Sequence, residues 1–352
     1  MPSNTFSYQK NTPTGIGSEQ IPLSTVLILQ QAEKFGVKWE SIIDTKILRL
    51  EYKGKVKYFR WQVSSETSFI GFHACLDKGE TKNLLRQANV SVSPGFKLIA
   101  SDSESYWREV FQTLKKPLVV KPSHGLQGKE IHLGITDEAT YFDAVKKSFL
   151  FTDQEDSGVI VETQFNGKEY RIVATREKVV AVLYREPANV VGDGTSTIQQ
   201  LIEQKNSDPR RGSDLNYALF KIDIDEDLKD TLTESHLSLT SIPSVNQKVY
   251  VRKVSNIARG GDSIDITDEV DPNVKEIAVR AMQAIPELGF AGIDMMTTDI
   301  TKPQTSESYI IVEINSSPGI CINEIPFKGE KRNTDREFLF VMFPELASEN
   351  IK

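Results

Sequence analysis

Residues 290–319 read FAGIDMMTTDITKPQTSESYIIVEINSSPG, and they carry the clearest structural signal in the chain. Two apolar runs in this stretch, at 291–296 and 309–314, have the composition of buried β-strands. Each run contains one acidic residue, Asp294 in the first and Glu313 in the second. A carboxylate in an apolar strand is costly unless a counter-charge or a metal ion compensates for it. The stretch therefore predicts two core strands that carry a metal site or buried ion pairs.

Three oxygen-bearing side chains favour the metal interpretation. Glu313 and Asn315 are two residues apart, so they lie on the same face of their strand. If the strand of Asp294 is its neighbour, three oxygen ligands converge without any His or Cys. Such hard ligands suit Mg²⁺ or Mn²⁺, with water and nucleotide phosphates in the remaining positions. The alternative is that backbone groups or arginines satisfy the two carboxylates.

Outward from this stretch, the patterns indicate a mixed α/β chain. Apolar residues at helical spacing predict helices over 23–36, 77–87 and 274–285. The segment 223–243 is charged and polar, and is a candidate surface insertion. Short runs of β-forming residues predict further strands at 37–43, on both sides of a hairpin turn at 53–55, and at 118–122, 158–162, 170–175, 178–184 and 248–254.

A polar loop with two glycines follows the predicted strand that ends near Lys121. It spans 123–129 and contains Gly125 and Gly128. It lacks the glycine spacing and the Ser or Thr of a Walker A loop, and the chain has no G-x-G-x-x-G motif. Glycines let backbone N–H groups approach phosphates closely. The loop is therefore a candidate phosphate-binding element, with a plain hairpin as the equal alternative.

Composition excludes several classes of protein. The 352 residues suggest two or three lobes, and the first ~20 of them look like a flexible arm. A formal net charge of -7 argues against a general nucleic-acid binder. No run of about 18 apolar residues occurs, so no membrane span is expected. The 2 cysteines, Cys75 and Cys321, are far apart, which disfavours a disulfide framework or a zinc site and fits a cytoplasmic setting.

Taken together, these pieces resemble the ATP-grasp superfamily. Their order carries the resemblance: Lys78, then Lys121 with its glycine loop, E-x-x-x-x-G-x-E-x-R over 162–171, then Asp294 and the E-x-N of residues 313–315. The resemblance covers about residues 23–344. The S-S-P-G sequence that follows Asn315 is closer to the cyanophycin type than to the bifunctional glutathione type. Four longer segments are similar to the ATP-grasp half of bifunctional glutathione synthetases and to the ATP-grasp region of cyanophycin synthetases: 185–212, 255–270, 290–301 and 310–319.

The resemblance implies an α/β ATP-grasp fold in which two lobes clasp ATP. The flap that closes over the nucleotide would be the loop 123–129, which includes Ser123. The implied organisation is a flexible arm at 1–20, an N-terminal α/β unit at 21–76, a small lobe with the glycine loop at 77–165, and a large lobe with the metal and substrate site at 166–346.

The same resemblance implies a role for each matching residue. Nucleotide binding would involve Lys78 and Lys121 at the phosphates, Ser123, Gly125 and Gly128 in the flap, Glu162, Thr163 and Phe165 in the adenine hinge, and Glu169 at the ribose hydroxyls. Arg171 would also belong to the nucleotide-binding residues. Two Mg²⁺ or Mn²⁺ ions would be held by Asp294, Glu313 and Asn315. The reacting phosphate and acyl group would be contacted by Arg252 and Asn256.

The implied activity is an ATP-dependent carboxylate–amine ligase that works through an acyl phosphate. Our first hypothesis for its substrates is γ-glutamylcysteine and glycine. The alternative is another amino-acid or dipeptide ligase of natural-product or cyanophycin-type synthesis. A nucleotide-binding regulator without turnover would show degraded metal ligands, yet all three are present. The expected partners are small amino-acid or peptide substrates, with no nucleic acid and no membrane; relatives of this family often form dimers, which suggests a homodimer.

Overall fold

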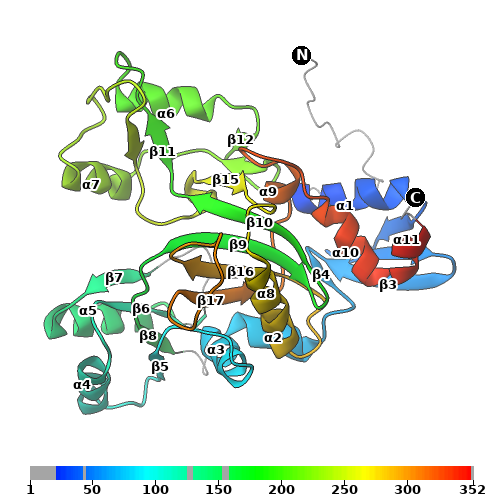
Figure 1. The fold of residues 1–352 in the computed structure, drawn as a ribbon, viewed down its shortest axis with the longest axis horizontal. Helices are drawn as coiled ribbons and strands as arrows, with labels where there is room; N and C mark the ends of the chain where they lie inside the picture. The colour runs from blue at the N-terminus through cyan, green and yellow to red at the C-terminus, as the bar shows by residue number, and fades with distance from the viewer. Residues whose placement is uncertain (1–20, 43–44, 125–129, 153–157, 350–352) are drawn as a thin grey trace.

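The described residues form three larger β-sheets, shown by a computed structural model of the chain (Figure 1). The structure describes residues 21–42, 45–124, 130–152 and 158–349. The predicted arm at 1–20 lies outside these residues, as do Gly125 and Gly128 of the predicted flap. Among the described helices, none has the length and apolar character needed to cross a membrane.

The central sheet has five strands and contains both apolar runs of the opening stretch. All its neighbouring strands are antiparallel. The predicted neighbour relation is confirmed, because β16 and β17 are paired and Asp294 lies opposite Glu313. The strand order is β15 (Asp262–Asp265), β10 (Val179–Glu186), β9 (Lys168–Thr175), β16 (Phe290–Thr297) and β17 (Tyr309–Asn315).

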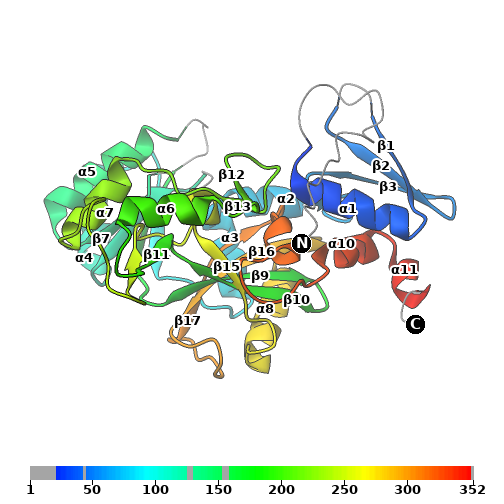
Figure 2. The ribbon, with the colours of Figure 1, turned by 90° about the horizontal axis from the view of Figure 1, so that it is seen from above.

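Helices cover both faces of this sheet because side chains alternate along its strands. On one face, Ile172 and Val182 pack in a cluster with α8 (Pro272–Ala284) and with Leu85 of α3 (Lys78–Gln87). On the other face, Val173 packs in a cluster with α10 (Thr334–Met342) and α1 (Leu23–Lys34). Figure 2 shows α1 running alongside α10. The predicted helices at 23–36, 77–87 and 274–285 are confirmed; the first two are slightly shorter than predicted, and the third spans Pro272–Ala284.

A second sheet has four antiparallel strands, and two helices cover one of its faces. These helices were missed by the sequence analysis, although Trp107 and Val110, and Tyr141, Ala144 and Val145, recur at helical spacing. The opposite face carries Lys121 and Glu162. The elements are β5 (Gly95–Leu98), β8 (Val159–Thr163), β6 (Leu118–Pro122), β7 (His132–Ile135), α4 (Glu104–Thr113) and α5 (Glu138–Phe149).

The N-terminal sheet contains the predicted hairpin. Its turn is at Lys53 and Gly54, which both adopt positive φ angles. The sheet lies beside α1, at the right of Figure 1. Its strands are β1 (Lys38–Ser41), β2 (Leu48–Tyr52), β3 (Lys55–Arg60) and β4 (Val63–Ser64), and helix α2 (Phe69–Leu76) follows them. Helix α11 (Pro344–Glu349) contacts the hairpin, because Tyr52 and Lys53 donate hydrogen bonds to Glu349.

The segment between β10 and β15 forms a small unit with its own apolar cluster. Helix α7 lies in the predicted insertion 223–243, and its Leu228 and Leu232 are buried in this cluster, so the segment is more than a surface loop. Strand β14 covers only the first three residues of the predicted strand 248–254. The elements are β11 (Asn189–Val191), α6 (Ile198–Asn206), β12 (Arg211–Gly212), β13 (Leu219–Phe220), α7 (Glu226–Glu234), β14 (Lys248–Tyr250) and the short helix Ile257–Arg259; α9 (Cys321–Glu324) follows β17. The lobe boundaries stay a prediction.

Candidate functional site

Two lysines of helix α3 contact the central sheet and the second sheet, which contains β5–β8. The Lys78 ammonium lies 3.8 Å from Glu313 on β17 of the central sheet. The Lys82 ammonium lies 2.5 Å from Glu162 on β8 of the four-stranded sheet. The two lysines are four residues apart, so they share one side of the helix. One helix therefore places a positive charge against each sheet.

A group of charged side chains gathers on the central sheet. Strand alternation puts Arg171, Arg185 and Asp294 on the face opposite α8. Asp294 is buried, with Arg171 Nε 2.5 Å from Oδ1 and Arg185 Nη2 3.0 Å from Oδ2. Arg185 also forms an ion pair with Glu169. The structure therefore brings the predicted residues Glu169, Arg171 and Asp294 together, and Arg185 gives Asp294 a second arginine partner.

The other two predicted metal ligands lie next to this group. Glu313 is opposite Asp294 in the sheet, and its side chain is 30% exposed, which leaves it accessible to a ligand. Asn315 Nδ2 donates a hydrogen bond to Glu313 Oε1 at 3.1 Å. Glu313 and Asn315 thus share one face, as the two-residue spacing predicts.

The second sheet contributes a buried carboxylate held by two lysines. Lys121 Nζ lies 2.6 Å from Glu162 Oε1, and Lys82 Nζ lies 2.5 Å from Oε2. All three side chains are almost fully buried. Both carboxylate oxygens are occupied, and Glu162 is paired with a strand on each side, so its adenine-hinge role stays a prediction.

The remaining hinge and flap residues lie at the ends of strands. Thr163 ends β8, and Phe165 lies in the link to β9, so this link joins the two sheets. Ser123 follows β6 and is fully buried, and its Oγ accepts a hydrogen bond from Gly158 N at 3.0 Å. The flap beyond Ser123 is largely outside the described residues, so its closing role stays a prediction.

The predicted catalytic pair lies in the unit between β10 and β15. The buried Arg252 guanidinium is 2.7 Å from both Asp225 and Asp227, at the start of α7. Asn256 Oδ1 accepts a hydrogen bond from Ala258 N and caps a short helical turn. These contacts do not connect the two residues to the lysine and carboxylate groups on the sheets, and their catalytic role stays a prediction.

Charge–charge contacts control the acidity of these carboxylates. Burial raises the pKa of Glu162, but Lys121 and Lys82 outweigh it and lower the pKa to about 2. Burial also raises the pKa of Glu313, and Lys78 and Arg171 reverse this and lower it to about 2. Burial raises the pKa of Asp294, Arg171 and Arg185 oppose the rise, and repulsion by Glu313 adds to it. Asp294 and Glu313 thus both depend on the positive charge of Arg171.

The stability of the folded chain should fall in acid because of Glu162. Its folded-state pKa lies below the usual 4.5, so the folded protein binds fewer protons than the unfolded chain. The stabilisation is therefore complete above about pH 4.5 and is lost as the pH falls towards 2. We expect the free energy of unfolding in urea to decrease between pH 5 and 3, and to decrease less steeply in Glu162→Gln. Equal slopes for the two proteins would contradict this assignment.

The donor set on the central sheet fits a small divalent cation. Within the described ranges, no three or more His, Cys, Asp or Glu side chains gather to hold a metal. The available donors are two carboxylates and one amide, all with oxygen atoms. Mg²⁺ usually takes one or two protein carboxylates and completes its shell with water and substrate phosphates. By residue type Asp294, Glu313 and Asn315 match this requirement. Both oxygens of the buried Asp294 face Arg171 and Arg185, however, so its role as a metal ligand stays a prediction.

Sequence reasoning missed two members of the site. Lys82 follows Lys78 by four residues on a predicted helix, and this spacing was an available signal. Arg185 lies in a strand, and only its pairing with β9 reveals that it faces Glu169 and Asp294. Both residues contact carboxylates that the sequence analysis had selected.

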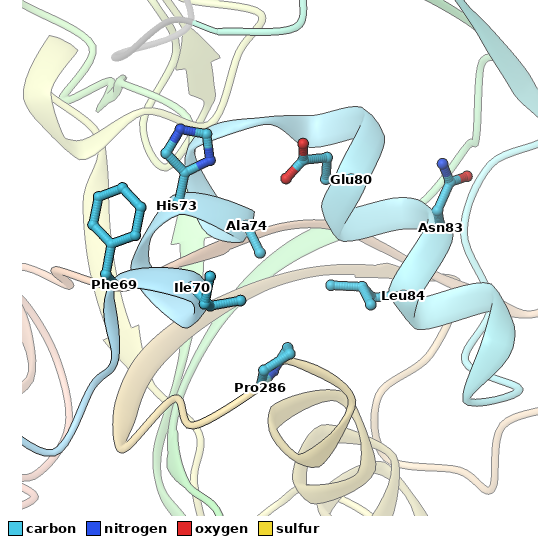
Figure 3. A pocket seen from close by; sticks show the side chains of 8 residues that line it. All are labelled: Phe69, Ile70, His73, Ala74, Glu80, Asn83, Leu84 and Pro286. Carbon is cyan, nitrogen blue, oxygen red and sulfur yellow. The ribbon is translucent and has the colours of Figure 1, made fainter.

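A separate groove of about 410 Å³ lies against a different side of α3 (Figure 3). It is lined by side chains from α2 and α3 and by Pro286. Phe69 and Ile70 project into solvent at its edge, with 75% and 60% of their surface exposed. None of the residues predicted to bind nucleotide or metal lines this groove. The ion network and the groove are therefore distinct features of the same helix.

Comparisons with known proteins identify relatives that cover nearly the whole chain. The chain is 35% identical over 334 residues to the glutathione biosynthesis bifunctional protein of Clostridium perfringens, covering 93% of this chain and 42% of the relative. It is 31% identical over 328 residues to the cyanophycin synthetase of Trichormus variabilis, covering 93% and 36%. No protein-family model matches the chain.

A solved structure supports the same relationship. The bifunctional glutathione synthetase from Pasteurella multocida superimposes with a TM-score of 0.72 at 29% identity, covering 93% of this chain and 44% of that chain. The chain thus spans less than half the length of these relatives. The relatives share a region with this chain and contain a further region that the alignment does not cover.

Proposed function

Because the chain has the ATP-grasp fold and is homologous to one region of glutathione and cyanophycin synthetases, we propose that it is an ATP-dependent carboxylate–amine ligase. The single observation that carries this proposal is the ion network in which α3 faces both sheets. Lys78 lies 3.8 Å from Glu313 on the central sheet, and Lys82 and Lys121 lie 2.5 and 2.6 Å from Glu162 on the second sheet. Such a combination can bind a triphosphate together with its divalent cation.

The nucleotide phosphates would be bound by Lys78 and Lys121. Both ammonium groups are nearly buried, so their attraction for an anion is weakly screened by water. Asp294, Glu313 and Asn315 would hold Mg²⁺ or Mn²⁺, which supplies positive charge that lets a carboxylate approach a polyphosphate. Glu169 would contact the ribose end, and its ion pair with Arg185 fixes its orientation.

The chemistry would proceed in two balanced steps. A carboxylate oxygen of the first substrate attacks the γ-phosphorus of ATP, the bond to the β–γ bridging oxygen breaks, and ADP leaves. An amine nitrogen of the second substrate then attacks the carbonyl carbon of the acyl phosphate, inorganic phosphate leaves, and the nitrogen loses a proton. The side chains act by positioning and by fixed charge, and no protein nucleophile is required.

Our first choice of substrates is γ-glutamylcysteine and glycine. It is supported by the similarity to the glutathione biosynthesis bifunctional protein over 93% of the chain. We expect purified protein with ATP and Mg²⁺ to form ADP over many turnovers only when both substrates are present. Reactions that omit one substrate serve as controls. If the complete mixture releases no more ADP than these controls, the glutathione hypothesis is wrong.

A second candidate is a ligase that joins other amino acids or short peptides. It is favoured by the S-S-P-G sequence at 316–319, which follows directly after Asn315, and by the similarity to cyanophycin synthetase. Mass spectrometry of amino-acid pairs incubated with ATP would detect its products as condensed masses. We further propose a cytoplasmic location and small-molecule substrates, and a homodimer stays a prediction.

A further inference from the structure

Lys82 is one of the most deeply buried charges among the described residues, and its ion pair is with Glu162. Its side chain is 4% exposed, and its ammonium lies 2.5 Å from Glu162 Oε2. Lys121 Nζ lies 2.6 Å from the other oxygen of the same carboxylate. The two ammonium groups are therefore linked through one shared partner.

The sheet geometry explains why this partner is shared. Strands β6 and β8 are antiparallel neighbours, with Lys121 opposite Ile160 and Val119 opposite Glu162. Lys121 and Glu162 are thus diagonal neighbours on one face, within reach of each other's long side chains. Helix α3 lies over this face and directs Lys82 at the outer oxygen of Glu162.

The net charge of Lys82, Lys121 and Glu162 indicates what Lys82 contributes to this group. Lys121 and Glu162 alone would form a neutral pair with little attraction for an anion. Lys82 adds one positive charge, so the three side chains carry an excess of one. A buried excess of this kind is unfavourable unless an anion compensates for it. A nucleotide phosphate is an anion of the required charge.

We propose that Lys82 is a positioning residue of the nucleotide site, which neutralises Glu162 and so keeps the Lys121 ammonium oriented and its charge available to a phosphate. This inference rests on the proposed function, since it assumes that the nucleotide binds at Lys121. Lys82 acts here through Glu162 and touches no substrate.

The arrangement also makes nucleotide binding sensitive to alkaline pH. Burial lowers the pKa of Lys82 to about 8, against the attraction of Glu162. The other charged groups that act on it, Lys121 and Arg86, both lower its pKa. As the pH rises through about 8, Lys82 loses its proton and the excess positive charge disappears. Phosphate affinity should therefore fall in this range, and should not fall if residue 82 stays charged.

The test is the affinity of the full chain for ADP with Mg²⁺, measured by titration calorimetry. We expect Lys82→Met to weaken ADP binding about 10-fold or more, because the ion pair that neutralises Glu162 is lost and this carboxylate then cancels the charge of Lys121. Lys82→Arg should bind ADP nearly as well as the wild type at pH 7, and should keep this affinity at pH 9, where the wild type weakens. Lys147→Met on the exposed side of α5 is the matched control and should bind normally.

A double variant separates positioning from simple structural support. In Lys82→Met/Glu162→Gln the negative charge that cancels Lys121 is removed as well, so ADP affinity should recover most of the loss. A lack of recovery would overturn the proposal, as would normal ADP binding by Lys82→Met. If Lys82→Met does not fold, the pH dependence of Lys82→Arg decides the question. The proposal is overturned if Lys82→Arg loses as much ADP affinity between pH 7 and pH 9 as the wild type does. If the wild-type chain binds no ADP, the proposed function fails instead.

Discussion

Replacing Glu313 by alanine should lower ADP formation by the chain about 100-fold or more, because a charge that holds the cation and orients the phosphates is lost. Glu313 lies opposite Asp294 in the sheet, accepts a hydrogen bond from Asn315 and lies 3.8 Å from Lys78. It is therefore the point at which the predicted metal ligands meet the predicted phosphate-binding lysines. The measurement is the steady-state rate of ADP release with saturating ATP, Mg²⁺ and the substrate pair that supports turnover.

Two further variants keep this result interpretable. Glu313→Gln preserves the shape of the side chain and removes only its charge, so it should lose activity to a similar degree. Glu307→Ala changes an exposed residue in the loop before β17 and should leave the rate unchanged. If Glu313→Ala keeps full activity while Glu307→Ala is normal, Glu313 is not a ligand of the cation.

Replacing Asp262 by alanine should destabilise the fold by about 3–5 kcal/mol, the cost of breaking a buried ion pair from one side. Asp262 is 1% exposed and lies on β15, where it accepts a hydrogen bond from Lys205 at 2.6 Å and forms an ion pair with Arg211. The Arg211 side chain is fully buried and also donates to the carbonyl oxygens of Phe220 and Gly260. Without Asp262, two cations would face each other inside the protein.

Urea unfolding monitored by fluorescence measures this effect. Asp208→Ala is the control, because Asp208 forms its ion pair with Arg210 near the surface, with side chains 20% and 35% exposed. Its removal should cost about 1 kcal/mol or less. A loss of similar size in the two variants would show that the Asp262 pair does not stabilise the core.

Local patterns predicted most of the elements that build the site. The alternation along β9 and β16 places Ile172 and Ile293 towards α8, and Arg171 and Asp294 on the opposite face. The two-residue spacing of Glu313 and Asn315 places them side by side. The helices α4 and α5 escaped detection although their apolar residues recur at helical spacing. These features depend on neighbours within one element, so the chain encodes them locally.

The partners of the charged residues could not be read in the same way. Lys121 and Glu162 are 41 residues apart, and Arg171 and Asp294 are 123 apart. Lys82 reaches Glu162 only because α3 packs against the central sheet while facing the smaller one. No periodicity in the chain contains such information, since it depends on strand order and on where a helix docks.

The amino-acid order alone thus identified two strands at 291–296 and 309–314, the acidic side chains within them and the resemblance to glutathione and cyanophycin synthetases. The strands and their acidic residues follow from short-range chemistry, namely residue type and fixed spacing, whereas the relationship rests on the resemblance of longer segments to known families. The folded arrangement alone established that Glu162 is shared by two lysines, that Arg185 joins Asp294, and that Arg252 lies with α7. Charges attract over the distances set by packing, and packing brings together segments that are remote along the chain.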